Sequence, residues 1–298
     1  MLKYYQAIVI GLIQGVTELF PISSLGHSVL IPALLGWDSL VSAQSKGESF
    51  YLAFLVALHV ATAIALFIYF RAEWYKILGG LWNSARERRV TTPDARLGLL
   101  LIVATIPAGL TGLVFEHELR TVFAKPEAAA IFLTINGFIL AGGELLRRRK
   151  RVNPVPAGEL PPGAEAPTNT WRNIESLSYG EAVFIGVTQI GALFAGISRS
   201  GITMVAGLWR GLNHEDAARF AFLLATPIIF AAGVYKLPDL MGSLGNGIRA
   251  QAFVGAVVAG IAAYFSTRFL VKYFETKTLW PFAFYCIGFG TFCMFHFA

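Results

Sequence analysis

Residues 14–27 of this chain read QGVTELFPISSLGH, and residues 189–203 read QIGALFAGISRSGIT. Both stretches carry polar residues inside long apolar sequence. Aligning them gives identical pairs: Gln14 with Gln189, Gly11 with Gly186, Ile22 with Ile197, Ser23 with Ser198 and Gly26 with Gly201. A carboxylate or guanidinium is costly inside a lipid bilayer, so its presence there indicates a purpose. The paired pattern predicts that the two stretches meet and build one site.

The composition is that of an integral membrane protein. Of 298 residues, 55% are hydrophobic and 14% are charged, whereas a soluble domain carries about a quarter charged residues. The net charge of +6 does not indicate a nucleic-acid partner, because the basic residues cluster in two connections between apolar segments. Such clustering is typical of membrane topology.

Six segments reach the length of about 20 apolar residues that a helix needs to cross a bilayer. They lie near 50–70, 97–116, 127–146, 217–236, 250–271 and 279–297. Two further apolar segments, 4–34 and 178–209, are broken at the middle by Gly, Ser or Pro. We expect both to be re-entrant helical hairpins lining a cavity. Kinked full spans are the alternative, because Pro and Gly are common in membrane helices.

The basic residues predict the orientation. They gather after the first span, between Arg71 and Arg96, and after the third, at Arg147–Arg151. By the positive-inside rule that face is cytoplasmic, which puts both termini outside. The first hairpin then enters from the outer face and the second from the cytoplasmic face.

Similar sequence with opposite insertion is an inverted repeat, in which the ligand lies near the membrane midplane. We therefore expect an all-α polytopic protein of six transmembrane helices and two re-entrant hairpins, forming one domain over 1–298. Its halves are 1–149 and 174–298. The proline-rich segment 150–173 between them is predicted to be a disordered cytoplasmic linker.

The first turn offers an acid, hydroxyls and an imidazole. Gln14 and Glu18 are four residues apart and share one helical face. Ser23, Ser24 and His27 follow a proline, at the start of the next arm, where backbone N–H groups favour anions.

The second turn offers donors for phosphate oxygens. Arg199 has a planar, permanently charged fork, and hydroxyl donors flank it. Glycines at Gly26 and Gly196 let the backbone approach a ligand closely. The remaining predicted substrate-binding residues are Ser198, Ser200 and Thr203.

Each residue also has a purely structural explanation. The serines are candidate helix caps, His27 a candidate core histidine, and Glu18 a candidate partner of Arg199. The combination in two matching turns favours a site. By contrast, His59, Thr62, Asn136 and Glu144 are assigned to helix–helix hydrogen bonds or interfacial positions.

The two motifs resemble the signature regions of the bacterial undecaprenyl-pyrophosphate phosphatase family, the bacitracin-resistance type, and the resemblance covers nearly the whole chain. This sequence differs from the family pattern at three positions. Gln14 is often Glu in the family, Ala195 is usually Pro, and Leu25 stands where a small or hydroxyl-bearing residue is common. The resemblance implies a bacterial plasma-membrane enzyme that hydrolyses a long-chain isoprenyl pyrophosphate to the monophosphate and phosphate. It also implies a divalent cation, Mg²⁺ or Ca²⁺, with Glu18 as a ligand. The expected partners are this lipid and the bilayer, with a homodimer as one assembly state.

The hypothesis for the mechanism is attack by Ser24 on the terminal phosphorus, with His27 or Glu18 as base and Arg199 stabilising the charge. Direct attack by water and a His27 nucleophile are alternatives. A transporter or flippase of polyprenyl phosphate lipids is the rival function, because inverted repeats with broken helices are a transporter architecture. A structural scaffold would have no use for this set of polar residues.

Overall fold

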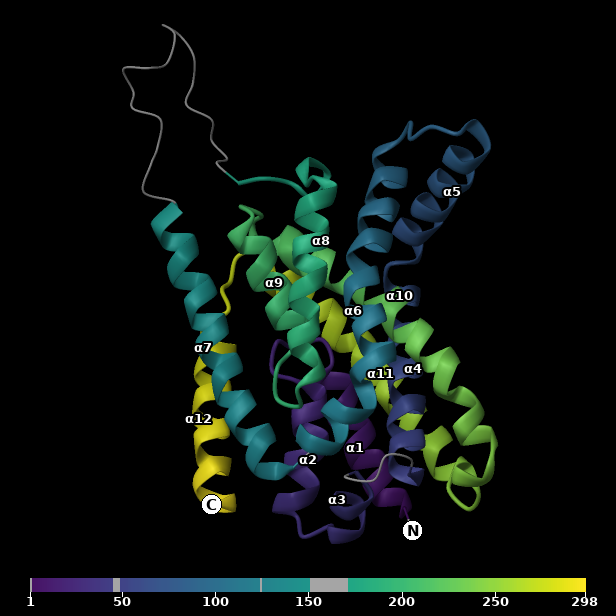
Figure 1. The fold of residues 1–298 in the computed structure, drawn as a ribbon, viewed down its shortest axis with the longest axis vertical. Coiled ribbons are helices and arrows are strands. Elements are labelled where there is room, and N and C mark those ends of the chain that lie inside the picture. The colour runs from purple at the N-terminus through teal and green to yellow at the C-terminus, as the bar shows by residue number, and fades with distance from the viewer. Residues whose placement is uncertain (1, 45–48, 124, 151–170) are drawn as a thin grey trace, which may run out of the picture.

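The computed structural model describes residues 2–44, 49–123, 125–150 and 171–298 (Figure 1). In these ranges the chain forms α-helices and short 3-10 helices, with one isolated bridge between Arg172 and Leu212 and no β-sheet. The all-α prediction is therefore confirmed. Most of the predicted linker, residues 151–170, lies outside the described ranges.

Five helices are long and apolar enough to cross a membrane. They are α4 (Phe50–Tyr69), α6 (Pro93–Phe123), α7 (Pro126–Lys150), α10 (His214–Met241) and α11 (Arg249–Phe274). The sixth predicted span forms α12 (Trp280–Phe297), which has 18 residues and packs along α7, but it is not among these five.

Helix–turn–helix units occupy both interrupted segments. The first consists of α1 (Tyr4–Thr17) and α2 (Ser24–Leu34). The second consists of α8 (Tyr179–Thr188), the 3-10 helix η2 (Gln189–Leu193) and α9 (Arg199–Trp209). At 1.5 Å per residue, arms of this length reach roughly 15–21 Å, short of a hydrocarbon core of about 30 Å. In Figure 1, α1 rises from the lower end and α8 descends from the upper end, so the turns meet near the middle.

Two further helices lie in connections. The short α3 (Asp38–Gln44) follows the first hairpin, and α5 (Arg71–Glu87) follows α4. The basic connection after the first span is thus largely helical, with Trp74, Ile77 and Ser84 buried along one face of α5. The spacing of these residues is helical, and the exposed face carries Arg71, Lys76 and Arg86 together with the aromatic side chains of Tyr75 and Trp82.

Glycines at equivalent positions let each hairpin pack closely on a long helix. A Cβ on Gly11 of α1 would lie 2.4 Å from the carbonyl oxygen of Gly255 on α11. A Cβ on Gly186 of α8 would lie 2.2 Å from the carbonyl oxygen of Ala104 on α6. Backbones approach this closely only where no side chain intervenes. The aligned glycines therefore serve the same purpose in the two hairpins.

Candidate active site

The two turns are capped in the same way and touch each other. The Ser23 hydroxyl accepts a hydrogen bond from the Gly26 amide at 3.2 Å, and the Ser198 hydroxyl accepts one from the Gly201 amide at 3.2 Å. Both serines are N-caps, which satisfy amides that a helix start leaves unpaired. The Ser23 hydroxyl also accepts from the Gly196 amide of the other turn at 3.2 Å. The two stretches thus meet, as the sequence predicts.

Asn136 of α7 forms hydrogen bonds with both turns. Its side-chain Nδ2 donates to the Pro21 carbonyl at 2.9 Å, and its Oδ1 accepts from the Ser198 amide at 3.0 Å. The residue is fully buried, so these bonds form away from solvent. A single side chain therefore fixes the spacing between the turns, a role that its isolated position in an apolar segment did not reveal.

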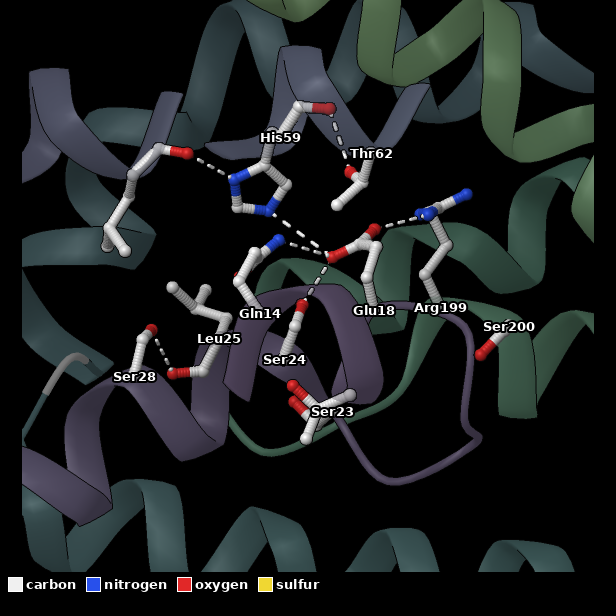
Figure 2. Close-up of polar contacts among 12 residues, drawn as sticks. Gln14, Glu18, Ser23, Ser24, Leu25, Ser28, His59, Thr62, Arg199 and Ser200 are labelled. Carbon is white, nitrogen blue, oxygen red and sulfur yellow. Dashed lines mark hydrogen bonds and ion pairs between the residues drawn. The ribbon is translucent and has the colours of Figure 1, made fainter. Parts of the chain in front are cut away.

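Glu18 is the centre of the polar cluster (Figure 2). Its Oε2 accepts from Gln14 Nε2 at 2.9 Å and from the Ser24 hydroxyl at 2.5 Å. Its Oε1 accepts from Arg199 Nη2 at 2.6 Å. Three donors on one buried side chain favour the ionised carboxylate. A hydroxyl that donates to a carboxylate is also placed to lose its proton to that carboxylate.

Glu18, Ser24 and Arg199 from this cluster line a cavity of about 270 Å³. Apolar side chains from α4, α10 and η2, such as Leu55, Ile229 and Leu193, line much of the rest, and Lys236 of α10 also reaches it. A charged pocket that continues between apolar walls suits an amphiphile with an anionic head.

Two side chains near the cluster have unused hydrogen-bonding capacity. Arg199 Nη1 and Gln189 Oε1 are buried and have no hydrogen-bond partner among the described residues. Gln189 uses its Nε2 for the Ala104 carbonyl, at 3.1 Å. Buried polar atoms normally find partners, and an anionic oxygen would match the donor on Arg199.

The structure separates the predicted site residues into two groups. The lining of the cavity includes Glu18, Ser23, Ser24, Ser198 and Arg199. Gln14 supports the Glu18 carboxylate without lining the cavity, and Gly26 and Gly196 shape the contact between the turns.

Two predicted phosphate donors have other partners. The Ser200 hydroxyl bonds to the Ser198 hydroxyl at 3.1 Å and the Phe20 carbonyl at 3.3 Å. The Thr203 hydroxyl donates to the Arg199 carbonyl at 2.7 Å. Neither lines the cavity.

His27 faces away from the cluster. Its Nδ1 lies 2.7 Å from the Ser23 carbonyl oxygen and its Nε2 lies 2.8 Å from the Tyr285 hydroxyl of α12. The ring stacks on Tyr285 and Phe289 and is buried. His27, predicted as a base or an alternative nucleophile, is thus not among the residues that line the cavity with Ser24.

His59 of α4 is the histidine that lines the cavity, with its Nε2 3.4 Å from Glu18 Oε2 (Figure 2). The sequence analysis assigned it to helix packing. It stands on a predicted span with no motif around it, so only the fold brings it to Glu18.

The donor set limits how a divalent cation would be held. The described residues contain no group of three or more His, Cys, Asp or Glu side chains that could hold a metal. Glu18 can supply one hard oxygen ligand, and Gln14 Oε1 is a buried carbonyl oxygen without a partner in the described structure. Mg²⁺ is commonly held by one or two carboxylates together with substrate phosphates, so these residues fit a cation that the diphosphate also binds.

An all-helical membrane protein with a buried polar cluster between two broken helices is the class that this fold and geometry define. The chain belongs to the family described as bacitracin resistance protein BacA, which matches residues 7–292. It is 52% identical to undecaprenyl-diphosphatase 2 of Frankia alni, over 100% of this chain and 98% of the relative. It is 54% identical to the undecaprenyl-diphosphatase of Mycolicibacterium paratuberculosis, over 96% of this chain and 94% of the relative. The predicted family is thereby confirmed.

Proposed function

We propose that this chain hydrolyses undecaprenyl pyrophosphate to undecaprenyl phosphate and phosphate in the bacterial plasma membrane. The relatives that match it nearly end to end are named undecaprenyl-diphosphatases. The observation that carries the proposal is the Ser24 hydroxyl bonded to the Glu18 carboxylate, with Arg199 on the other carboxylate oxygen. The proposed nucleophile Ser24, the proposed base Glu18 and the Arg199 guanidinium thus line one cavity.

In the proposed first step, Ser24 Oγ attacks the terminal phosphorus and its proton passes to Glu18 Oε2. Arg199 binds the non-bridging oxygens through Nη1, and the amides at the start of α9 add further donors. A bound cation would neutralise charge on the diphosphate, with Glu18 as its protein ligand. Water then cleaves the phosphoserine and regenerates Ser24.

The arrangement in the membrane is part of the proposal. The two hairpins form an inverted repeat, with the halves at 1–149 and 174–298 and both termini outside. The opposite directions of α1 and α8 support this, as do the matched caps. The helix α5 and the end of α7, whose sequences hold most of the clustered basic residues, both lie at the upper end of Figure 1. The sixth crossing is α12.

Labelling of intact cells with an impermeant thiol reagent tests the arrangement. A cysteine introduced near residue 298 should react, and one at residue 160 should react only after permeabilisation. The native Cys286 and Cys293 are both buried, which keeps the background low. The opposite pattern would overturn the orientation.

Release of phosphate tests the activity. Purified protein in detergent, with Mg²⁺ or Ca²⁺, should release phosphate from a long-chain isoprenyl pyrophosphate, and Glu18→Gln should not. Transfer of a polyprenyl phosphate across proteoliposomes without any phosphate release would instead support the flippase function.

A further inference from the structure

We propose that Lys236 of α10 binds the phosphate that stays on the lipid, while Arg199 binds the terminal phosphate that is removed. The inference rests on the proposed phosphatase activity and adds a substrate-binding residue outside both motifs. Its basis is the place of Lys236 in the cavity wall, the register of α10 against α4 and the charge balance of the polar cluster.

One face of α10 forms part of the cavity wall. The residues on this face are Ile228, Ile229, Ala232, Gly233 and Lys236, which recur at helical spacing. Lys236 stands at the end of the apolar part of this span. A lysine in a membrane helix is costly unless it faces water or a partner. Its position on the face that lines the cavity therefore favours a role in binding over a role in packing.

Packing between α10 and α4 places Lys236 about one helical turn from the polar cluster. A Cβ on Gly233 would lie 2.3 Å from Val60 Cγ2, so these two residues are level. The residue before Val60 is His59, whose Nε2 lies 3.4 Å from Glu18 Oε2. Lys236 is three residues beyond Gly233, which is about 4.5 Å along the helix. Helical side chains lean towards the N-terminus, so Lys236 leans back towards the level of the cluster.

Small side chains separate Lys236 from the cluster. Ala232 and Gly233 occupy the turn of α10 just before Lys236, and they line the cavity with it. Neither has an atom beyond Cβ that could fill the space in front of the helix. A phosphate group therefore has room between the ammonium group of Lys236 and the cluster.

The charge balance of the cavity calls for a second cation. Glu18 Oε1 and Arg199 Nη2 form an ion pair at 2.6 Å, so their charges largely cancel. The described residues that line the cavity include one further lysine or arginine, which is Lys236. The phosphate that departs with the lipid becomes a monoester, which carries about −1.5 to −2 charges at neutral pH. A fixed ammonium group in the same cavity matches that charge.

Lys236 is available for such a ligand. Its Nζ lies 5.7 Å from the centre of the Tyr235 ring, and the side chain is partly exposed. A cation–π contact at a partly exposed position is weak, whereas a hydrogen bond between two charged groups is strong. An ammonium group has three donors, so a phosphate can replace the ring as its partner.

Binding of two anions to the full-length protein in detergent tests the assignment, with the Mg²⁺ concentration held constant. The probes are a short-chain isoprenyl monophosphate and inorganic phosphate, each titrated by calorimetry. Lys236→Met should weaken binding of the monophosphate by about 10–100-fold, the range for loss of a hydrogen bond to a charged group. It should leave binding of inorganic phosphate within a few-fold. Arg199→Ala should show the reverse pattern.

Turnover provides a second readout. Lys236→Met should lower kcat/KM for the isoprenyl pyrophosphate by a factor similar to its loss of monophosphate binding. Lys236→Arg keeps the charge and should restore most of both values. Lys3→Met is the matched control, because Lys3 is exposed, lies outside the cavity lining and has its Nζ 5.8 Å from the Tyr5 ring. It should behave as wild type.

Lys236→Gln keeps a polar head and should show the same losses at the wild-type melting temperature, which separates binding from folding. Wild-type binding of the monophosphate by Lys236→Met and Lys236→Gln would overturn the inference while the phosphatase activity stands. Equal weakening for both anions would also overturn it, because Lys236 would then act as a general positive charge and not at a separate subsite. Failure of the wild type to release phosphate would reject the proposed function, and the monophosphate titration would still test Lys236.

Discussion

The two turns share a scaffold and differ in chemistry. Both place a serine N-cap before the second arm, at Ser23 and Ser198, with a hydroxyl-to-amide distance of 3.2 Å in each. The next position is Ser24 in one turn and Arg199 in the other, and both bind Glu18. Positions that are identical in the alignment thus build the turns, and positions that differ supply the reacting groups.

The same division holds along the first arms. Gln6 and Glu181 occupy equivalent positions, and each accepts from the backbone amide three residues earlier, at 3.0 and 2.9 Å. Glu18 itself is matched by Leu193, which lines the apolar part of the cavity. Internal repetition therefore identifies the architecture, and departures from the repetition identify the active groups.

The largest expected effect is at the second turn. Arg199→Ala should lower phosphate release by at least about 10²–10³-fold, because it removes a fixed charge aimed at the phosphate oxygens. Arg199→Lys should restore little, because lysine lacks the planar fork. Arg71→Ala, at an exposed position on α5, is the control for loss of a positive charge. Wild-type turnover by Arg199→Ala would remove the second turn from the chemistry.

The first turn separates its two serines. Ser24→Ala should abolish most of the activity, because the proposed nucleophile is lost. Ser23→Ala should mainly cost stability, about 1 kcal/mol for a lost N-cap. Parallel measurement of kcat and of the melting temperature compares the two. If Ser24→Ala kept a substantial fraction of the rate, activated water would be the better nucleophile.

Two glycines of the second turn should differ in their tolerance of a methyl group. Gly196 has φ 114°, and a Cβ there would lie 2.5 Å from the Ala129 carbonyl oxygen. Gly196→Ala should cost about 1–3 kcal/mol from the backbone conformation alone. At Gly201 the nearest atoms to a Cβ are side-chain carbons at 3.1 and 3.2 Å, so Gly201→Ala should cost less. Thermal unfolding in detergent measures both, and equal losses would contradict the expectation.

The smallest expected effect is a change in stability at the start of the second hairpin. A hydrogen bond from Arg172 holds the pKa of Glu181 at about 2, below the usual value of 4.5. Because the folded-state pKa is lowered, the stabilisation is complete above about pH 4.5 and is lost as the pH falls towards 2. Glu181→Gln should therefore cost less than about 1 kcal/mol at neutral pH, since Arg172 is 37% exposed.

The equivalent change in the first hairpin provides the comparison. Gln6→Ala should alter stability by an amount that does not depend on pH, because Gln6 does not titrate. Melting temperatures of wild type, Glu181→Gln and Gln6→Ala between pH 3 and 7 would show the difference. A gap between wild type and Glu181→Gln that is unchanged at pH 3 would rule out the ion pair as its source.

Features set by local sequence could be predicted. Apolar length gave the spans, and glycine, serine and proline marked the breaks at 17–24 and 189–199. The α5 helix lies in the basic connection after the first span, for which no helix was predicted, although its buried residues have helical spacing. The orientation of the His27 side chain could not be predicted, because its partner Tyr285 is 258 residues away in the sequence. His59 was missed for the same reason: only tertiary packing turns α4 so that this residue meets Glu18.

The double hydrogen bond of Asn136 has a consequence for how the centre of the molecule opens. Because the same side chain bonds to Pro21 and to the Ser198 amide, neither turn can separate from α7 without disturbing the support of the other. Amide hydrogens of the two turns should therefore exchange with solvent in a single cooperative event, although 175 positions separate Ser23 from Ser198. The two turns should therefore move together when the cavity opens.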